Sequence, residues 1–208
     1  MAISLLELYG LKLNTSEQVY EPAEDTFLGI EALEKAITLS KSKNLKMLDM
    51  GCGTGIIGLY ASSKPEISDV VLADINPVAV ALAKENIQAN SVEKAHAVES
   101  DLFSNIDGIF DILAFNAPYL REEQERNKDP YESLMVSGGE EGVEVSIKFI
   151  DEAEKHVHKG SLVIITASSL SNLDKLDEAI RKHGYVVSEK LARHYFFEDI
   201  IAMILRKT

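Results

Sequence analysis

Three closely spaced glycines that follow a short apolar run are the feature that most limits the folds open to this chain. Residues 45–50 are predicted to form a buried strand, and residues 56–63 have the composition of a helix. The segment that joins them reads Asp49-Met50-Gly51-Cys52-Gly53-Thr54-Gly55. Glycines let the backbone turn tightly and approach a ligand closely, and the first N–H groups of a helix can bind an anionic group. The segment therefore predicts a strand–loop–helix unit with a binding site at the carboxyl end of the strand.

Strands and helices alternate over most of the remaining chain. We predict further strands over residues 69–74, 95–99, 110–115, 162–166, 185–190 and 200–205. We predict helices over residues 22–39, 76–90, 143–160 and 173–182, whereas the first twenty residues show no clear period. This alternation predicts an α/β fold with a mostly parallel sheet and helices on both faces. Because about ten residues and no helix separate the last two strands, we expect them to form an antiparallel hairpin at one edge.

The charge of the chain limits its partners. Its 208 residues are enough for a single α/β domain, and 34 acidic residues against 21 basic ones give a formal net charge of −13. Nucleic-acid binding draws its affinity from basic groups, so this composition argues against a nucleic-acid partner. Cys52 is the single cysteine, so we expect no disulfide framework and no metal site. With no apolar run near roughly 18 residues and no basic leader, we expect no membrane association and a cytoplasmic location.

The next predicted strand ends in a carboxylate suited to a nucleoside. Asp74 lies 19 residues after Gly55, where it can accept hydrogen bonds from both ribose hydroxyls. Gly53, Gly55 and Gly58 also fit the G-x-G-x-x-G pattern of dinucleotide-binding proteins. The glycine loop by itself therefore leaves an NAD protein open as an alternative.

Two further acids favour S-adenosyl-L-methionine over NAD. Asp49, close before the first glycine, can accept the amino group of a methionine moiety. Asp101 follows the third predicted strand and can accept a proton from an adenine amino group. The simpler alternatives are that the glycines only tighten a turn and that Asp101 caps a loop.

A short motif after the fourth predicted strand has the composition of a catalytic pocket. It reads Asn116-Ala117-Pro118-Tyr119. The Asn116 side-chain oxygen and the Ala117 carbonyl can each accept one N–H of a planar NH₂ group, while the Tyr119 ring packs against it. The nitrogen is then directed at a methyl group for in-line displacement, so catalysis is mainly positioning and electrostatics. The simpler alternative is an Asn-Pro turn that closes the strand.

The sequence also resembles a known family. The tetrapeptide is similar to the N-P-P-Y motif of amino methyltransferases that act on planar NH₂ groups. The segment Val19-Tyr20-Glu21-Pro22-Ala23-Glu24-Asp25-Thr26-Phe27 resembles the pre-motif of the HemK-like glutamine methyltransferases, especially their short archaeal and eukaryotic branch. Asp-Ile-Asn-Pro at residues 74–77 and Gly-Gly-Glu-Glu-Gly at residues 138–142 extend the resemblance over nearly the whole chain.

The resemblance implies a fold and a set of contacts. The fold is the Rossmann-like class I methyltransferase fold, with a seven-stranded mixed sheet, over residues 1–208 as one domain, and residues 1–40 contribute to the cofactor site. The implied contacts with S-adenosyl-L-methionine, together with the loop glycines, are Thr26, Asp49, Gly51, Gly53, Gly55, Asp74, Asp101 and Leu102. Asn116 and Tyr119 would hold the substrate amide. Ala117 stands where the family usually has Pro, but its carbonyl remains and Pro118 still biases it toward extended geometry.

The implied substrate is a protein. The branch methylates the glutamine amide in the Gly-Gly-Gln loop of translation release factors, and its eukaryotic members work with a small zinc-binding activator protein. Three alternatives stay open at this point. The same pocket suits a flipped adenine or guanine in DNA or RNA, with Tyr119 stacked on the base. The enzyme could instead methylate lysine, or the chain could be a nucleotide-binding module without catalysis.

Overall fold

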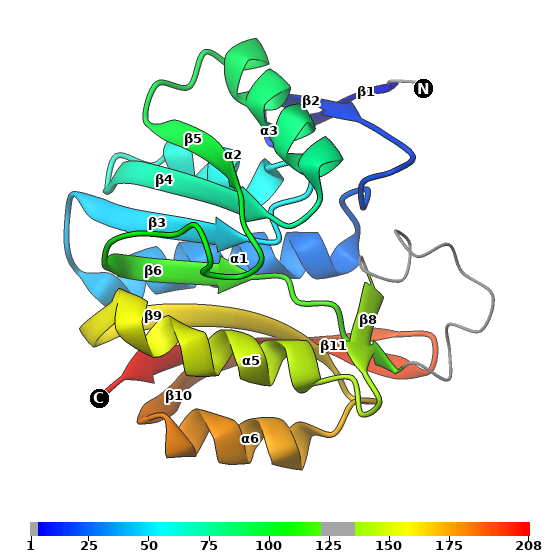
Figure 1. Ribbon diagram of the computed structural model, residues 1–208, viewed down its shortest axis with the longest axis vertical. Helices are drawn as coiled ribbons and strands as arrows, with labels where there is room; N and C mark the ends of the chain where they lie inside the picture. Colours follow the sequence, from blue (N-terminus) through cyan, green and yellow to red (C-terminus); the bar gives the residue numbers. More distant parts are fainter. Residues whose placement is uncertain (1–3, 122–135) are drawn as a thin grey trace.

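A central seven-stranded sheet organises the molecule, whose computed structural model describes residues 4–121 and 136–208 (Figure 1). The strands lie in the order β10–β11–β9–β6–β3–β4–β5. The strands, in chain order, are β3 (Leu45–Met50), β4 (Ile67–Asp74), β5 (Ala95–Glu99), β6 (Phe110–Phe115), β9 (Val157–Ser168), β10 (Tyr185–Tyr195) and β11 (Glu198–Lys207). β11 runs antiparallel to both neighbours, and the pairs from β9 to β5 are parallel. The mixed sheet with an antiparallel hairpin at one edge is confirmed.

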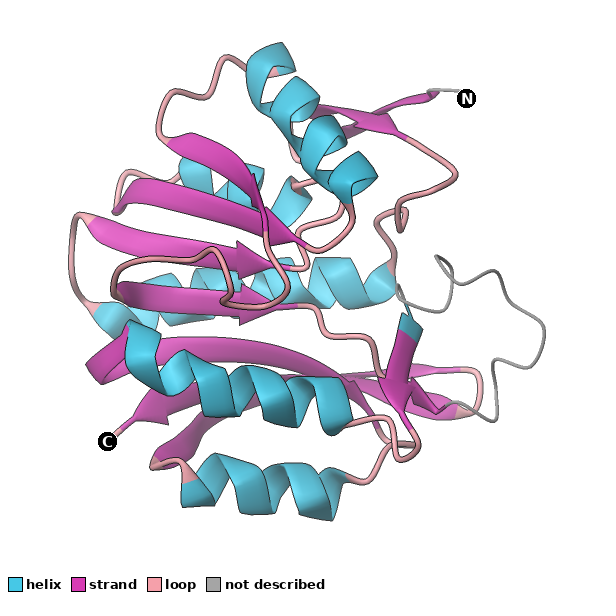
Figure 2. Ribbon diagram, viewed as in Figure 1, coloured by secondary structure: helices cyan, strands magenta, loops and turns pink. Residues whose placement is uncertain are grey.

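Helices cover both faces of the sheet (Figure 2). One face packs against α1 (Glu24–Ser40), α2 (Ile56–Ser62) and α3 (Pro77–Ala89). The other packs against α5 (Glu144–Ala153) and α6 (Leu173–Lys182). Successive residues of a strand point to opposite faces, so the sheet contributes to two hydrophobic cores. This explains why the central strands are continuous apolar runs rather than alternating ones.

Local signals at the helix ends explain several boundaries. The Asn76 side chain accepts a hydrogen bond from the Val78 N–H at 2.9 Å, and Pro77 is the first residue of α3. α6 begins in the same way, because the Asn172 side chain accepts from the Lys175 N–H at 3.2 Å. The predicted ranges of these helices are therefore confirmed to within a residue.

Two predicted helix boundaries are wrong. α1 begins at Glu24 rather than Pro22, because the Thr26 hydroxyl accepts the Ala23 N–H at 3.3 Å and closes the first turn there. The helix expected to continue to residue 160 ends at Ala153 and is followed by a 3₁₀ turn. Val157 already belongs to β9, where it pairs with Phe110, so its apolar side chain follows the period of a strand and not of a helix.

The hairpins also differ from the expectation. β10 and β11 extend until Tyr195 pairs with Glu198, so two residues, not about ten, connect them. The first twenty residues contain the hairpin β1 (Ser4–Leu8) and β2 (Leu11–Thr15), which the sequence did not reveal. Its buried leucines pack into the core beside α2 and α3. A two-stranded element, β7 (Leu120–Arg121) with β8 (Ser137–Gly139), lies beyond the end of β6.

The parallel strands bring their carboxyl ends to one edge of the sheet (Figure 1). In an open α/β sheet the loops at this edge form the ligand crevice. The predicted glycine loop follows β3, Asp74 ends β4, Asp101 follows β5 and Asn116 follows β6. Among the described residues, no helix has the length and apolar character needed to cross a bilayer.

Candidate active site

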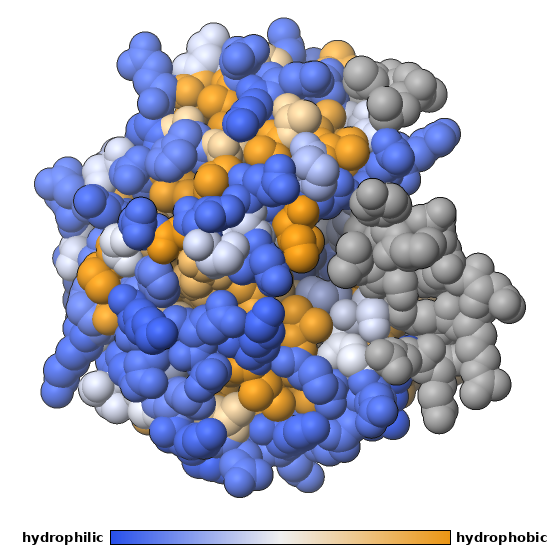
Figure 3. Space-filling view, viewed as in Figure 1, coloured by the Kyte–Doolittle hydropathy of each residue, from blue (hydrophilic) through white to orange (hydrophobic). Residues whose placement is uncertain are grey.

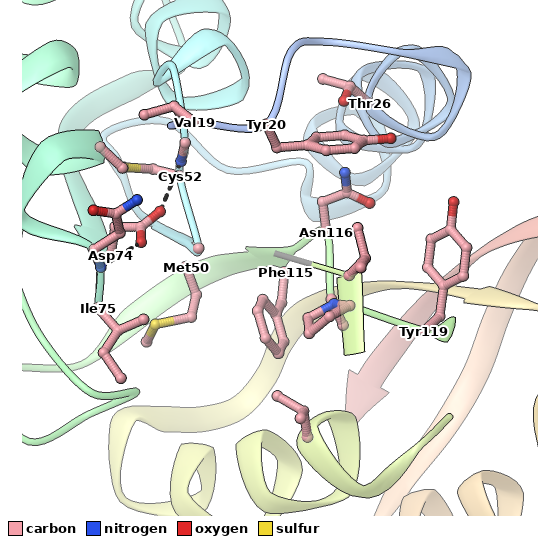
Figure 4. A pocket seen from close by; sticks show the side chains of 18 of the residues that line it. Val19, Tyr20, Thr26, Met50, Cys52, Asp74, Ile75, Phe115, Asn116 and Tyr119 are labelled. Atoms are coloured by element: carbon pink, nitrogen blue, oxygen red, sulfur yellow. Dashed lines mark hydrogen bonds between the residues drawn. The ribbon is translucent and has the colours of Figure 1, made fainter. Parts of the chain in front are cut away.

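A cavity of about 1120 Å³ opens at the carboxyl ends of the strands (Figure 4). Single ligand pockets typically occupy ≈ 300–1,000 Å³, so this cavity has room for a cofactor together with an acceptor side chain. Most residues predicted from the sequence line it, namely Thr26, Gly51, Gly53, Asp74, Asp101, Leu102, Asn116, Ala117, Pro118 and Tyr119. Asp49 and Gly55 are not among the lining residues. The structure thus brings together segments from residue 19 to residue 198.

The glycine loop owes its shape to close packing. Gly51 has φ +61°, and a Cβ there would lie 3.1 Å from the Phe115 ring. Gly55 has φ +82°, and a Cβ there would lie 2.8 Å from the Leu72 side chain, closer than real Cβ contacts. Gly51 therefore lets the backbone form the cavity wall. Gly55 serves the packing of the loop on β4, and its contact with the cofactor stays a prediction.

Asp74 presents a carboxylate to the cavity. One of its oxygens accepts the Gly53 N–H and the other accepts the Asn76 N–H, each at 2.9 Å (Figure 4). Burial raises the pKa of Asp74, while hydrogen bonds from backbone N–H groups act in the opposite direction. Each carboxylate oxygen has further acceptor capacity, so Asp74 can still bind hydroxyl groups of a ligand. Asp74 lines the cavity, and its contact with a ribose stays a prediction.

Asp49 lies behind the loop rather than in the cavity. Its side chain is 1% exposed, and one carboxylate oxygen accepts the Gly58 N–H at 2.8 Å. Because strand residues alternate, Asp49 points to the face covered by α2, while the next residue, Met50, lines the cavity. Burial raises the pKa of Asp49 to about 7, against the opposing effect of the Gly58 hydrogen bond. In this structure Asp49 ties β3 to α2, and its contact with an amino group stays a prediction.

Asp101 and Leu102 form part of the rim. The Asp101 side chain is 59% exposed, and its carboxylate lies 3.5 Å from the Nζ atom of Lys148 on α5. Leu102 is buried and has φ +45°. Ile75, which follows Asp74, is 47% exposed and adds an apolar side chain to the same part of the cavity. This end therefore combines an exposed acid with apolar side chains, a surface on which a purine can bind.

A second polar group lies around Asn116. Its amide nitrogen donates to the Asp25 carboxylate at 3.2 Å, and its amide oxygen accepts from the Thr166 hydroxyl at 2.5 Å. The hydroxyls of Tyr20 and Tyr119 also donate to Asp25, at 3.1 Å and 3.3 Å. Asp25 is only 4% exposed. The carboxylate accepts hydrogen bonds but donates none, so it holds the nitrogen of the Asn116 amide toward Asp25 and leaves the oxygen on the side of Thr166.

Burial and the Asp25 charge keep both tyrosines protonated. Burial is the largest influence that raises the pKa of Tyr119, followed by the Asp25 carboxylate, with a further contribution from Glu198. The pKa of Tyr20 is raised by burial and by Asp25 in the same order. Both phenols therefore remain hydrogen-bond donors at physiological pH. The group offers a planar NH₂ an acceptor oxygen on Asn116 and an aromatic ring on Tyr119.

The centre of this group carries no signal that was recognised in the sequence. Asp25 and Tyr20 lie inside the segment that carried the family resemblance, but only Thr26 was assigned a contact. Thr166 and Glu198 come from the ends of β9 and β11 and had no recognisable motif. The available signal was a pair of acids at the start of α1, of which the second, Asp25, is buried. Within residues 4–121 and 136–208, no three His, Cys, Asp or Glu side chains are grouped to hold a metal ion.

Residues 28–192 match the methyltransferase small domain family. The chain belongs to this family. The match spans the glycine loop, Asp74 and the Asn116 motif, whereas the cavity residues around Tyr20 and Asp25 and Glu198 lie outside the matched range. Membership favours a methyltransferase over the alternative of an NAD protein.

Two relatives place this methyltransferase more closely. A putative protein N5-glutamine methyltransferase of Methanocaldococcus jannaschii is 36% identical over 199 residues, which cover 96% of this chain and 97% of the relative. The eRF1 methyltransferase catalytic subunit mtq2 of Schizosaccharomyces pombe is 30% identical over 206 residues, which cover 88% of this chain and 87% of the relative. These matches confirm the resemblance to the short archaeal and eukaryotic branch of HemK-like glutamine methyltransferases.

Solved structures confirm the fold of the methyltransferase. A ribosomal protein L11 methylase from Lactobacillus delbrueckii has a TM-score of 0.67 at 19% identity, covering 93% of this chain and 84% of that one. The E. cuniculi Mtq2-Trm112 complex, described as responsible for methylation of eRF1, has a TM-score of 0.64 at 23% identity. The match covers 92% of this chain and 99% of that one. The predicted class I methyltransferase fold is therefore correct.

Proposed function

We propose that this chain uses S-adenosyl-L-methionine to methylate the side-chain amide of a glutamine in a translation release factor. The observation that carries the proposal is the position of the Asn116 amide, held between Asp25 and Thr166 in the same cavity as the glycine loop and Asp74. The names of the two relatives, a protein N5-glutamine methyltransferase and an eRF1 methyltransferase subunit, support the same substrate class.

The residues of the cavity fit the proposed cofactor. Gly51 and Gly53 leave backbone exposed along the cavity wall, and Asp74 offers acceptor oxygens for hydroxyl groups. Ile75 and Leu102 provide an apolar surface for a purine. When bound, the cofactor would supply a methyl group activated by a positively charged sulfur. The role of Asp101 toward the adenine amino group remains a prediction.

The chain's own residues would orient the acceptor. An amide nitrogen is a weak nucleophile because its lone pair is delocalised into the carbonyl. Hydrogen bonds from its two N–H groups to the Asn116 oxygen and the Ala117 carbonyl would increase its electron density and fix its direction. Tyr119 would pack on the planar group, and the buried surroundings strengthen each of these interactions. Removal of the proton need not precede attack, so the site does not require a strong base.

The charge of the chain supports a protein substrate over nucleic acid. A net charge of −13 disfavours approach to a phosphate backbone. On the face in Figure 3, hydrophilic side chains dominate and hydrophobic ones lie in smaller patches among them. Base methylation and lysine methylation are the alternative outcomes of the test below.

A small partner protein is part of the proposal. The E. cuniculi relative is described as a complex with Trm112, so we propose that a comparable protein binds this chain. Zinc binding by that partner and a cytoplasmic location remain predictions.

The test is transfer of labelled methyl to a purified release factor, with and without a cell extract that supplies a partner. We expect label on the glutamine of the Gly-Gly-Gln loop, mapped by mass spectrometry of proteolytic fragments. Replacing that glutamine by alanine should remove the label. An Asn116→Ala enzyme should bind the cofactor and transfer almost no methyl. Label on lysine, or label released by nuclease, would contradict the proposed substrate and leave the fold and the family unchanged.

A further inference from the structure

Two adjacent phenylalanines form the tip of the β10–β11 hairpin. Phe196 is 90% exposed and Phe197 is 93% exposed, whereas the next most exposed large hydrophobic residue in the described chain, Leu5, is 61% exposed. A single exposed apolar side chain is ordinary, but two neighbouring aromatic rings in full contact with water are not. The contacts of the fold do not account for them, because both rings stand clear of the core.

The backbone at the tip is strained. Phe196 has φ +48° in a two-residue connection between Tyr195 and Glu198. Turns of this kind normally place Gly, Asn or Asp where φ is positive, because a larger side chain is disfavoured there. Phe196 is therefore an aromatic residue at a position where glycine would relieve backbone strain and where the side chain gains no stability from burial. Such a combination points to a function outside folding.

The tip adjoins the acceptor end of the cavity. Glu198 follows Phe197 directly and lines the cavity, and its carboxylate accepts from the Ser168 hydroxyl at the end of β9. Consecutive Cα atoms are about 3.8 Å apart, so the tip stands at the rim of the cavity. The Glu198 charge also influences Tyr119, which places this rim on the side of the Asn116 group. In Figure 4 Tyr119 lies between Asn116 and the ribbons of the C-terminal strands.

We propose that Phe196 and Phe197 dock the protein substrate by inserting into an apolar pocket on its surface, outside the methylated loop. The inference rests on the proposed function only in requiring a protein substrate. A folded protein that inserts one side chain into the cavity must bring its surface over this rim, where the two rings meet it. A free peptide can reach the cavity without touching the tip.

Charge near the tip favours a protein with basic groups around that pocket. Glu198 and Asp199 follow the two rings, and Asp199 pairs with His194 at 2.8 Å. The same acids repel an anionic membrane surface, so a lipid occupant fits less well. Exposed aromatic residues beside a polar rim have the composition of an interface anchor.

The test compares an intact substrate with a short one. The variant Phe196→Gly/Phe197→Ser removes both rings and suits the positive φ, so we expect it to fold normally. Its kcat/KM on the intact release factor should fall at least about tenfold, mainly through KM, as loss of an aromatic anchor does. Its kcat/KM on a short peptide with the same glutamine, and its affinity for the cofactor, should change less than about twofold.

The matched control lies on the same hairpin. Val186 and Val187 are 49% and 46% exposed at the opposite end of β10, so Val186→Ser/Val187→Ser removes apolar surface away from the cavity. We expect this variant to match the wild type on both substrates. A methyl-transfer assay with the wild type comes first, since its failure on the release factor would refute the proposed function and not the docking contact.

Four outcomes would overturn the inference. If the variant and the wild type have the same KM for the intact protein that the wild type methylates, the two rings do not dock that protein. Equal losses on protein and peptide show that the tip supports the cavity itself. A change from dimer to monomer in sedimentation assigns the rings to a second copy of this chain. Loss of binding to vesicles of phosphatidylcholine and phosphatidylserine assigns them to a membrane surface.

Discussion

Asp25 is the position whose substitution tests the site most directly. Its carboxylate accepts from Tyr20, Asn116 and Tyr119, and from the N–H and hydroxyl of Thr26. In Asp25→Asn the volume is kept, but one acceptor oxygen becomes an NH₂ donor. That donor cannot bind the donors it faces, so the Asn116 amide loses its partner or rotates. Rotation would turn its nitrogen, instead of its oxygen, toward the acceptor amide.

The magnitude follows from the kind of bond that is lost. A hydrogen bond to a charged group contributes about 1.5–3 kcal/mol, and every ~1.4 kcal/mol is a factor of ten in rate. We therefore expect kcat/KM for the methyl acceptor to fall roughly 10- to 100-fold. Cofactor affinity should change much less, because Asp74 and the glycine loop are untouched. The Thr26 N–H bond at 2.7 Å can persist to the remaining oxygen, so the start of α1 should stay folded.

The assay is steady-state methyl transfer to the release factor, with cofactor affinity measured by calorimetry. Tyr20→Phe serves as the control, because it removes one donor to Asp25 and keeps the ring. It should lose less activity than Asp25→Asn. Circular dichroism melting confirms that each variant is folded. A folded Asp25→Asn enzyme with activity within threefold of the wild type would refute the orienting role. An equal loss of cofactor affinity would move Asp25 to the cofactor site.

Three further predictions concern the loop and its acids. Asp74→Ala should raise the cofactor dissociation constant at least about tenfold in calorimetry. It should also lower the melting temperature, because the Gly53 and Asn76 N–H groups lose their acceptor; an unchanged constant in the folded variant contradicts the ribose contact. Gly55→Ala should destabilise the fold by about 1–3 kcal/mol in urea titration, since its φ is positive and the new Cβ meets Leu72; unchanged stability contradicts that packing. Asp49 keeps its proton in the folded state up to a pKa of about 7, so the free energy of unfolding of the wild type should fall as the pH rises from about 4 to 7. Relative to Asp49→Asn, the fall should reach up to ~1.4 kcal/mol per pH unit. Urea midpoints of the two proteins that change in parallel with pH would contradict this prediction.

Local patterns predicted much of the fold. Asn76, Pro77 and Asn172 mark helix starts through bonds made within a few residues, and such signals can be read without tertiary structure. The prediction fails where a local pattern is ambiguous. Val157 fits a helical period by spacing alone, but its backbone pairs with β6, and that long-range contact makes the residue part of a strand.

The hairpins were hidden for a related reason. Strand pairs are specified by their partners, and the partners of β1 and β2 are each other, α2 and α3. Leu11 and Leu13 alternate with more exposed residues, but this alternation identifies a half-buried strand only when the covered face is known. The short turn at Phe196 was overlooked because it lacks the Gly or Asn that marks most two-residue hairpins.

The sequence by itself determined the strand–loop–helix unit, the positions of Asp74 and Asn116 at strand ends, and the family. These depend on spacing along the chain. Only the tertiary structure decided that Asp25 meets Asn116, 91 residues away, and that Asp49 points behind the loop. The physical reason is that side-chain direction on a strand depends on which face each helix covers. Contacts between distant segments form only when both faces of the sheet are packed.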